Sequence, residues 1–153
     1  MCVIGMGNTL MGDDGVGVKV AEALSQRDLG PDIQVVSGGT AGMALSRYFT
    51  DSDQVLVVDA IAVGDTPGSV FRFTPQDAGI TALRSHTSHG LSLPNIMLAA
   101  QLQGALPQVM VYAVQIGDIT CGFDTLTPEV DAVVADVADM VAEEAMRLAA
   151  DLG

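Results

Sequence analysis

The sequence predicts an α/β protein: a three-layer sandwich in which a twisted, mostly parallel (mixed) five-stranded sheet lies between helices on both faces. Four segments are continuously apolar and rich in β-branched residues, which is typical of strands covered on both faces. Segments with helical periodicity separate them, and strands that alternate with helices form right-handed parallel units. We expect residues 1–153 to form a single domain, because a chain of 153 residues buries a sizeable core.

The first two predicted strands each lead into a helix. The apolar segment CVIGM (2–6) precedes a helix expected at 14–27, where valine and leucine recur every three or four residues on one side. The segment IQVVS (33–37) is the second strand, and a helix is expected after it at 40–49.

The third predicted strand, QVLVVDA (54–60), is followed by a segment that breaks the alternation. GSVFRFT (68–74) also has the character of a strand, but only the turn VGDTPG separates the two. This turn is too short for a helical crossover. We therefore expect residues 68–74 to return antiparallel, at or near an edge of the sheet.

The rest of the chain supplies two helices and one strand. The helix expected at 92–103 has Ser92 as its N-cap and Pro94 in its first turn. The strand QVMVYAVQI (108–116) follows, and a stripe of valine and leucine side chains predicts a last helix at 128–152.

Charge and composition argue against several classes of protein. Nineteen acidic residues against six basic ones give a net charge of −13, which would repel a phosphate backbone, so we expect no nucleic-acid partner. No apolar run approaches the roughly 20 residues of a membrane-spanning helix. The N-terminus lacks a signal-peptide pattern, and Cys2 and Cys121 form no CxxC motif. We expect a cytoplasmic protein without a membrane span.

Polar residues gather at the carboxyl ends of the predicted parallel strands, where ligands bind in such sheets. In chain order they are Gly7, Asn8, Asp13, Asp14, Gly38, Gly39, Thr40, Asp59, His86 and His89. We expect the glycines among them, together with Asn8 and Thr40, to contact the substrate.

The glycines after the first strand do not predict a phosphate loop. The spacing of Gly5, Gly7 and Gly12 does not fit GxGxxG, and the lysine of a P-loop is missing. The second strand ends at Ser37, where a dinucleotide fold would have an acidic residue. Two aspartates at a helix start would also repel a pyrophosphate.

Asp14, Asp59 and His89 instead predict an incomplete site for a divalent metal. A carboxylate that closes an apolar run is costly to bury unless it is paired or bound to a cation. Two carboxylates and one imidazole from three loops leave open metal positions. Alternatives stay open: Asp13 or Asp14 only caps the helix, Asp59 caps a loop, or His86 replaces His89.

Four motifs in this order resemble the hydrogenase maturation proteases, the processing endopeptidases of nickel-iron hydrogenases. The motifs are GMGNTLMGDDGVGV, SGGTAGM, VLVVDAI and SHGLSL. The resemblance extends over nearly the whole chain and includes GDITCGFDTLTPEV before the last helix. It implies an α/β fold and an endopeptidase that trims a C-terminal peptide from the precursor of the hydrogenase large subunit once nickel has been inserted.

By motif position, the family's metal-contacting residues fall on Asp14, Asp59 and His89. The resemblance implies that Asp14 and Asp59 are also the catalytic residues of an aspartyl-type endopeptidase. Two positions depart from the family pattern: Ser37 stands where members often carry Asp, and Asp14 stands where some carry Glu. Ser37 leaves any catalytic role of an acid at that position in doubt.

Two mechanisms and two other functions stay open. In our main hypothesis nickel arrives within the substrate and is recognised by Asp14, Asp59 and His89, and no organic cofactor takes part. Alternatively, Asp59 or Asp14 acts as a general base without metal catalysis. The other functions are a noncatalytic nickel-binding or hydrogenase-docking module and, third, a nucleotide-binding α/β protein. We expect a monomer.

Overall fold

The structure, a computed structural model, describes residues 1–78, 93–104, 106–120 and 122–152. Its strands form one sheet in the order β2-β1-β3-β5-β4. The strands are β1 (Cys2–Met6), β2 (Gln34–Gly39), β3 (Gln54–Ile61), β4 (Val70–Phe73) and β5 (Gln108–Gln115). The first four in spatial order run parallel, and β4 pairs antiparallel with β5 at one edge. The predicted five-stranded mixed sheet is confirmed.

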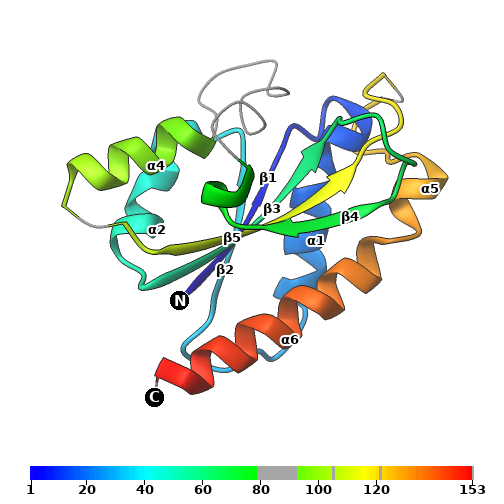
Figure 1. Ribbon diagram of the computed structural model, residues 1–153. Helices are drawn as coiled ribbons and strands as arrows, with labels where there is room; N and C mark the ends of the chain where they lie inside the picture. The colour runs from blue at the N-terminus through cyan, green and yellow to red at the C-terminus, as the bar shows by residue number, and fades with distance from the viewer. Residues whose placement is uncertain (79–92, 105, 121, 153) are drawn as a thin grey trace.

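Helices cover both faces of this sheet (Figure 1). They are η1 (Gly12–Gly15), α1 (Val16–Ser25), η2 (Gly42–Leu45), α2 (Ser46–Thr50), α4 (Leu93–Leu102), α5 (Pro128–Asp131) and α6 (Val134–Leu152). Residues 75–78 are also helical. In the described part of the chain, no helix is long and apolar enough to cross a membrane.

The alternation of side chains along each strand divides the core into two halves. In β1, Val3 packs with the valines of α1 and α6, whereas Ile4 packs with Phe49 of α2 and Ile96 of α4. Successive side chains of a strand point to opposite faces, so each inner strand contributes to both halves. The continuous apolar runs in the sequence reflect this burial on two sides.

The antiparallel return of β4 confirms the expectation drawn from the short turn. The turn between β3 and β4 is held by the buried side chain of Gln115, whose Oε1 accepts hydrogen bonds from the N–H groups of Val63 and Asp65. A side chain from β5 therefore fixes the path that brings β4 beside it.

Three helices differ from the sequence prediction in their details. The helix expected at 40–49 consists of the 3-10 turn η2 (Gly42–Leu45) followed by α2 (Ser46–Thr50). The first α-helix begins at Val16, after the 3-10 turn η1, and not at Asp14. The last helix is divided into α5 and α6, because the N–H of Val133 donates to the carbonyl of Val130, only three residues back. This shorter hydrogen bond tightens the chain and interrupts the α-helical ladder.

Candidate functional site

The loop between β1 and α1 lies close to the sheet because glycines remove side chains from the contact. A Cβ on Gly17 of α1 would lie 2.3 Å from the carbonyl oxygens of both Met6 and Val58, and a Cβ on Gly5 would lie 2.1 Å from the oxygen of Gly17. The start of α1 thus rests directly on the backbones of β1 and β3. This packing brings the two aspartates of η1 to the carboxyl edge of the sheet.

Asp13 is a structural residue. It is fully buried and accepts hydrogen bonds from the N–H groups of Gly117 (2.8 Å), Asp118 (2.9 Å) and Thr127 (2.6 Å). The hydroxyl of Thr127 donates to the same carboxylate. Asp13 therefore anchors the loop between β5 and α5, which differs from the helix cap considered from the sequence.

Asp14, the next residue, has a different environment. Its carboxylate is half-buried, and its Oδ2 accepts one hydrogen bond, from the N–H of Asn8 at 2.8 Å. Burial raises the pKa of Asp14, and the hydrogen bond from Asn8 opposes this increase. Oδ1 has no hydrogen-bond partner among the described residues, so one oxygen is available to a ligand.

Asp59 lies near the end of β3, on the strand next to β1. The pKa of Asp59 is raised to about 7. Burial is the largest cause and the charge of Asp14 adds to it, whereas the hydrogen bond from the N–H of Ala60 acts in the opposite direction. Two carboxylates that share a site in this way have different affinities for protons. Near neutral pH, Asp59 is therefore partly protonated.

The structure thus brings together two of the three residues of the predicted metal set. His86 and His89 lie outside the described residues, so the histidine of the set stays a prediction. Within the described ranges, no group of three or more His, Cys, Asp or Glu side chains is arranged to hold a metal ion. The pair Asp14 and Asp59 supplies oxygen donors, which need at least one further ligand.

The predicted substrate-contacting residues lie at the carboxyl end of β2 and on the loops that follow β1 and β2. The N–H of Gly7 donates to the carbonyl of Gly39 at 3.1 Å, which joins the loops after β1 and β2. Gly7 has a φ of 131°, and a Cβ there would lie 1.9 Å from the carbonyl oxygen of Asp14. Gly38 is buried against Ile4, whereas Thr40 is exposed. Close packing therefore explains the glycines at positions 7 and 38 without a substrate. Substrate contact by the predicted residues stays a prediction.

Sequence reasoning missed three exposed apolar side chains, on the loop that leads into η1 and on the loop between β5 and α5. Leu10, Ile119 and Phe123 are 63%, 40% and 71% exposed. The N–H of Asp124 donates to the carbonyl of Thr9 at 2.6 Å, so the two loops that carry these side chains lie side by side. The signal was present in the sequence, since large apolar residues stand there among glycine, aspartate and threonine.

The fold and the carboxylate pair define an α/β protein with acid–base or cation-binding chemistry at the carboxyl edge of its sheet. The sequence profile of the family described as "Hydrogenase maturation protease" matches residues 18–144. The chain therefore belongs to the hydrogenase maturation protease family. This confirms the resemblance drawn from the four motifs, and with it the prediction of an endopeptidase.

Individual relatives agree with this assignment. The Hydrogenase 2 maturation protease of Escherichia coli is 29% identical over 141 residues, which cover 91% of this chain and 86% of the relative. The hydrogenase expression/formation protein HupD of Bradyrhizobium diazoefficiens is 30% identical over 144 residues, with coverages of 92% and 75%. The solved hydrogenase maturating endopeptidase HybD from Escherichia coli superposes with a TM-score of 0.81 at 28% identity, covering 92% of this chain and 88% of that one.

Proposed function

We propose that this chain removes the C-terminal extension from the precursor of a nickel-iron hydrogenase large subunit, after nickel has been inserted, and that it acts in the cytoplasm as a monomer. One observation carries the proposal: a member of the maturation protease family holds two partly buried carboxylates at the carboxyl edge of its sheet. Asp14 and Asp59 interact strongly enough for the charge of one to raise the pKa of the other.

Nickel enters this proposal as part of the substrate. Asp14 and Asp59 each keep one oxygen without a hydrogen-bond partner among the described residues. Carboxylate oxygens combined with an imidazole, here that of His89, suit a borderline divalent ion with open positions. An arriving cation would also remove the repulsion between the two carboxylates. The site would then bind a loaded precursor more tightly than an empty one.

Asp59 has a second role in the proposal, as the general base. A group whose pKa is about 7 is half-ionised at neutral pH and can accept a proton from a water that attacks the scissile carbonyl. The charge of Asp14 raises the pKa of Asp59 and so favours the protonated form of Asp59 after the transfer. Recognition of nickel requires a nickel-loaded precursor, whereas base catalysis requires only a water and the scissile peptide bond. Cleavage assays with loaded and nickel-free precursor therefore separate the two roles.

The exposed side chains of Leu10, Ile119 and Phe123 support a polypeptide as the substrate. They lie on the loop that leads into η1, which contains Asp14, and on the loop between β5 and α5, and backbone hydrogen bonds join these two loops. Apolar surface beside a polar site is typical of sites that bind a protein segment. We propose that these side chains contact the precursor next to the bond that is cut.

The proposal is tested by mixing the purified protein with nickel-loaded and nickel-free precursor and following the precursor's mass. We expect cleavage of the loaded precursor only. Asp14→Asn and Asp59→Asn should each lower the rate by about 100-fold or more. Asp32→Asn is the matched control, because Asp32 is exposed and its carboxylate has no hydrogen-bond partner in the described part of the chain.

Equal cleavage of both precursors would contradict recognition of nickel and leave the general-base role. An unchanged mass of a precursor that still binds would instead support a noncatalytic docking module. Ser37 favours this second candidate, because it lies exposed on β2 where many family members carry Asp.

A further inference from the structure

We propose a second binding site, for a carboxylate group joined to an apolar body, in a cavity at the amino ends of β3 and β5. This end of the sheet is opposite to the edge that carries Asp14 and Asp59. The cavity has a volume of about 520 Å³, which is within the size range of small-ligand sites. The inference does not depend on the proposed function.

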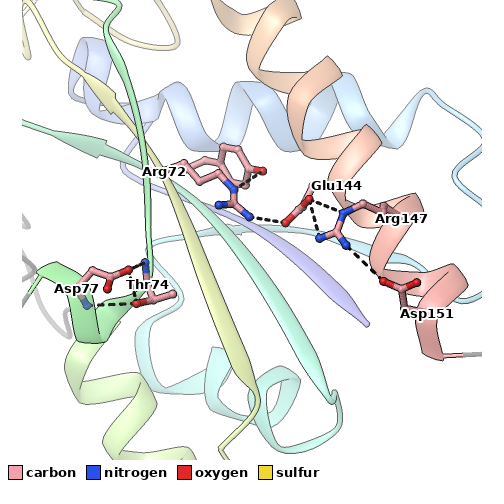
Figure 2. A network of polar contacts seen from close by, with 7 residues as sticks. Arg72, Thr74, Asp77, Glu144, Arg147 and Asp151 are labelled. Carbon is pink, nitrogen blue, oxygen red and sulfur yellow. Dashed lines mark hydrogen bonds and ion pairs between the residues drawn. The ribbon is translucent and has the colours of Figure 1, made fainter.

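Two arginines give this cavity its positive charge. Arg72 at the end of β4 and Arg147 on α6 both line it, and Glu144 lies between them (Figure 2). Arg72 donates to Oε1 of Glu144 at 2.6 Å, while Arg147 lies 3.0 Å from Oε2. The lining itself carries two positive charges and one negative charge, and Asp151, outside the lining, pairs with Nη1 of Arg147 at 3.3 Å. The acidic partners thus balance the arginines overall, but two guanidinium groups at one cavity still offer donors that an anion can bind.

Arg72 keeps an unused donor group, whereas each nitrogen of the Arg147 guanidinium already contacts an acid: Nε and Nη2 contact Glu144, and Nη1 contacts Asp151. Each guanidinium has five N–H groups in a planar fork. Arg72 uses Nε toward the hydroxyl of Tyr112 and Nη2 toward Glu144, which leaves Nη1 without a partner among the described residues. The side chains of Arg72 and Arg147 are 49% and 55% exposed, so a ligand can reach them. A carboxylate matches this fork and accepts two parallel hydrogen bonds from it.

Glu144 holds the two arginines in place. Its side chain is only 14% exposed. Burial by itself would raise the pKa of Glu144, but the hydrogen bonds from Arg72 and Arg147 outweigh burial and lower it. Glu144 therefore stays ionised at neutral pH and orders both guanidinium groups before a ligand arrives, which lowers the entropy cost of binding.

The remaining lining suits an apolar group with amide neighbours. Leu106, Val109, Met110 and Leu148 supply apolar walls. The side-chain Oε1 of Gln54 is buried without a hydrogen-bond partner in the described part of the chain. Rotation about the terminal side-chain torsion of Gln54 would present its Oε1 to an N–H of the ligand. The new hydrogen bond would remove the free-energy penalty of a buried, unpaired acceptor. This requirement favours the C-terminal residue of a peptide over a free fatty acid.

The test uses nuclear magnetic resonance titration of the full chain with three probes: N-acetyl-glycyl-leucine, its C-terminal amide, and hexanoate. We expect saturable shifts of the backbone amides of Val109 and Leu148 with the free dipeptide acid. Amidation should weaken binding by about tenfold, because it removes the charge that the arginines bind. If hexanoate bound as tightly as the dipeptide acid, the site would be assigned to free carboxylic acids. That result would still support the recognition of a carboxylate joined to an apolar body.

Two variants and a control locate the binding. Arg72→Gln and Arg147→Gln should each weaken the dipeptide acid by about tenfold. Arg27→Gln removes the same charge, but Arg27 pairs with Asp139 outside the cavity and should leave binding unchanged. Absence of saturable shifts, equal binding of the amide, or equal losses in all three variants would overturn the proposal.

Discussion

Asp13 and Asp14 are neighbours of identical chemistry, and the protein uses them for different purposes. Asp13 is fully buried and accepts hydrogen bonds from three backbone N–H groups, whereas Asp14 accepts one from the described residues, which leave its other oxygen without a partner. The sequence predicts that Asp14 and Asp59 reach the same edge, because both follow the ends of parallel strands. It does not separate Asp13 from Asp14, since the partners of Asp13 lie more than 100 residues away in the chain.

Asp13→Asn should destabilise the protein while leaving Asp14 in place. An amide supplies only one acceptor oxygen, and its NH₂ group would face backbone donors. We expect the free energy of unfolding to fall by about 2–4 kcal/mol, measured by urea denaturation. Asp32→Asn, on an exposed position, should change it by less than about 0.5 kcal/mol. Equal effects of the two variants would contradict the anchoring role.

Asp59 should make stability depend on pH in a defined direction. Its pKa is about 7 in the folded protein and 3.8 in the unfolded chain, so the folded state binds the proton more tightly. The stabilising contribution is therefore fully present below pH 3.8 and decreases as the pH rises through 7.

Urea unfolding at pH 5 and pH 8 measures this contribution. The wild type should lose stability between these values, and Asp59→Asn should lose less, because the variant has no proton to release. Asp32→Asn should retain the wild-type pH dependence. If the pH dependence of Asp59→Asn matched that of the wild type, the raised pKa would be contradicted.

The contact between α1 and the sheet depends on a glycine inside the helix. A glycine such as Gly17 ordinarily lowers helix stability, since glycine in a helix is about 1 kcal/mol less favourable than alanine. Here a Cβ would lie 2.3 Å from two backbone oxygens, so the usual preference is reversed.

Gly17→Ala should therefore destabilise the protein by about 1–3 kcal/mol, as overpacking does, and should displace η1 with its aspartates. Thermal unfolding gives the loss of stability, and cleavage of the precursor reports the displacement. Glu22→Ala is the control, because it adds a helix-favouring residue on an exposed position of the same helix. A Gly17→Ala variant more stable than the wild type would contradict the close packing.

Element types and the antiparallel position of β4 follow from the sequence, but helix boundaries follow only in part. Periodicity identifies α1 and α6, and the short turn VGDTPG forces β4 to return beside its neighbours. The division of the last helix is invisible in the pattern, because it depends on a single hydrogen bond from Val133 to Val130. The 3-10 turn η1 depends equally on contacts with a distant loop.

At the scale of the whole molecule, we propose that residues 1–153 unfold as one domain. Both halves of the core share the strands of a single sheet, so neither half retains its packing without the other. The chain has no tryptophan and two tyrosines. Tyr112 belongs to the half covered by α1 and α6, and Tyr48 packs against the other half.

Single-tyrosine variants test this cooperativity. Tyr48→Phe leaves the fluorescence of Tyr112 as the reporter of one half, and Tyr112→Phe leaves Tyr48 as the reporter of the other. Within each variant, the midpoint from tyrosine fluorescence should coincide with that from far-ultraviolet circular dichroism. Separate midpoints within one variant would indicate two independently folding parts.

The hydrogen bonds of Asp13 have a consequence for the protein during its synthesis. They connect positions that are 104 to 114 residues apart, so the set of donors to Asp13 is complete only when Thr127 is available. A growing chain that ends before Thr127 would bury this carboxylate with fewer hydrogen-bond donors, which is unfavourable. We therefore expect the turn η1, which carries Asp14 beside Asp13, to gain its full set of contacts only after most of the polypeptide has been synthesised.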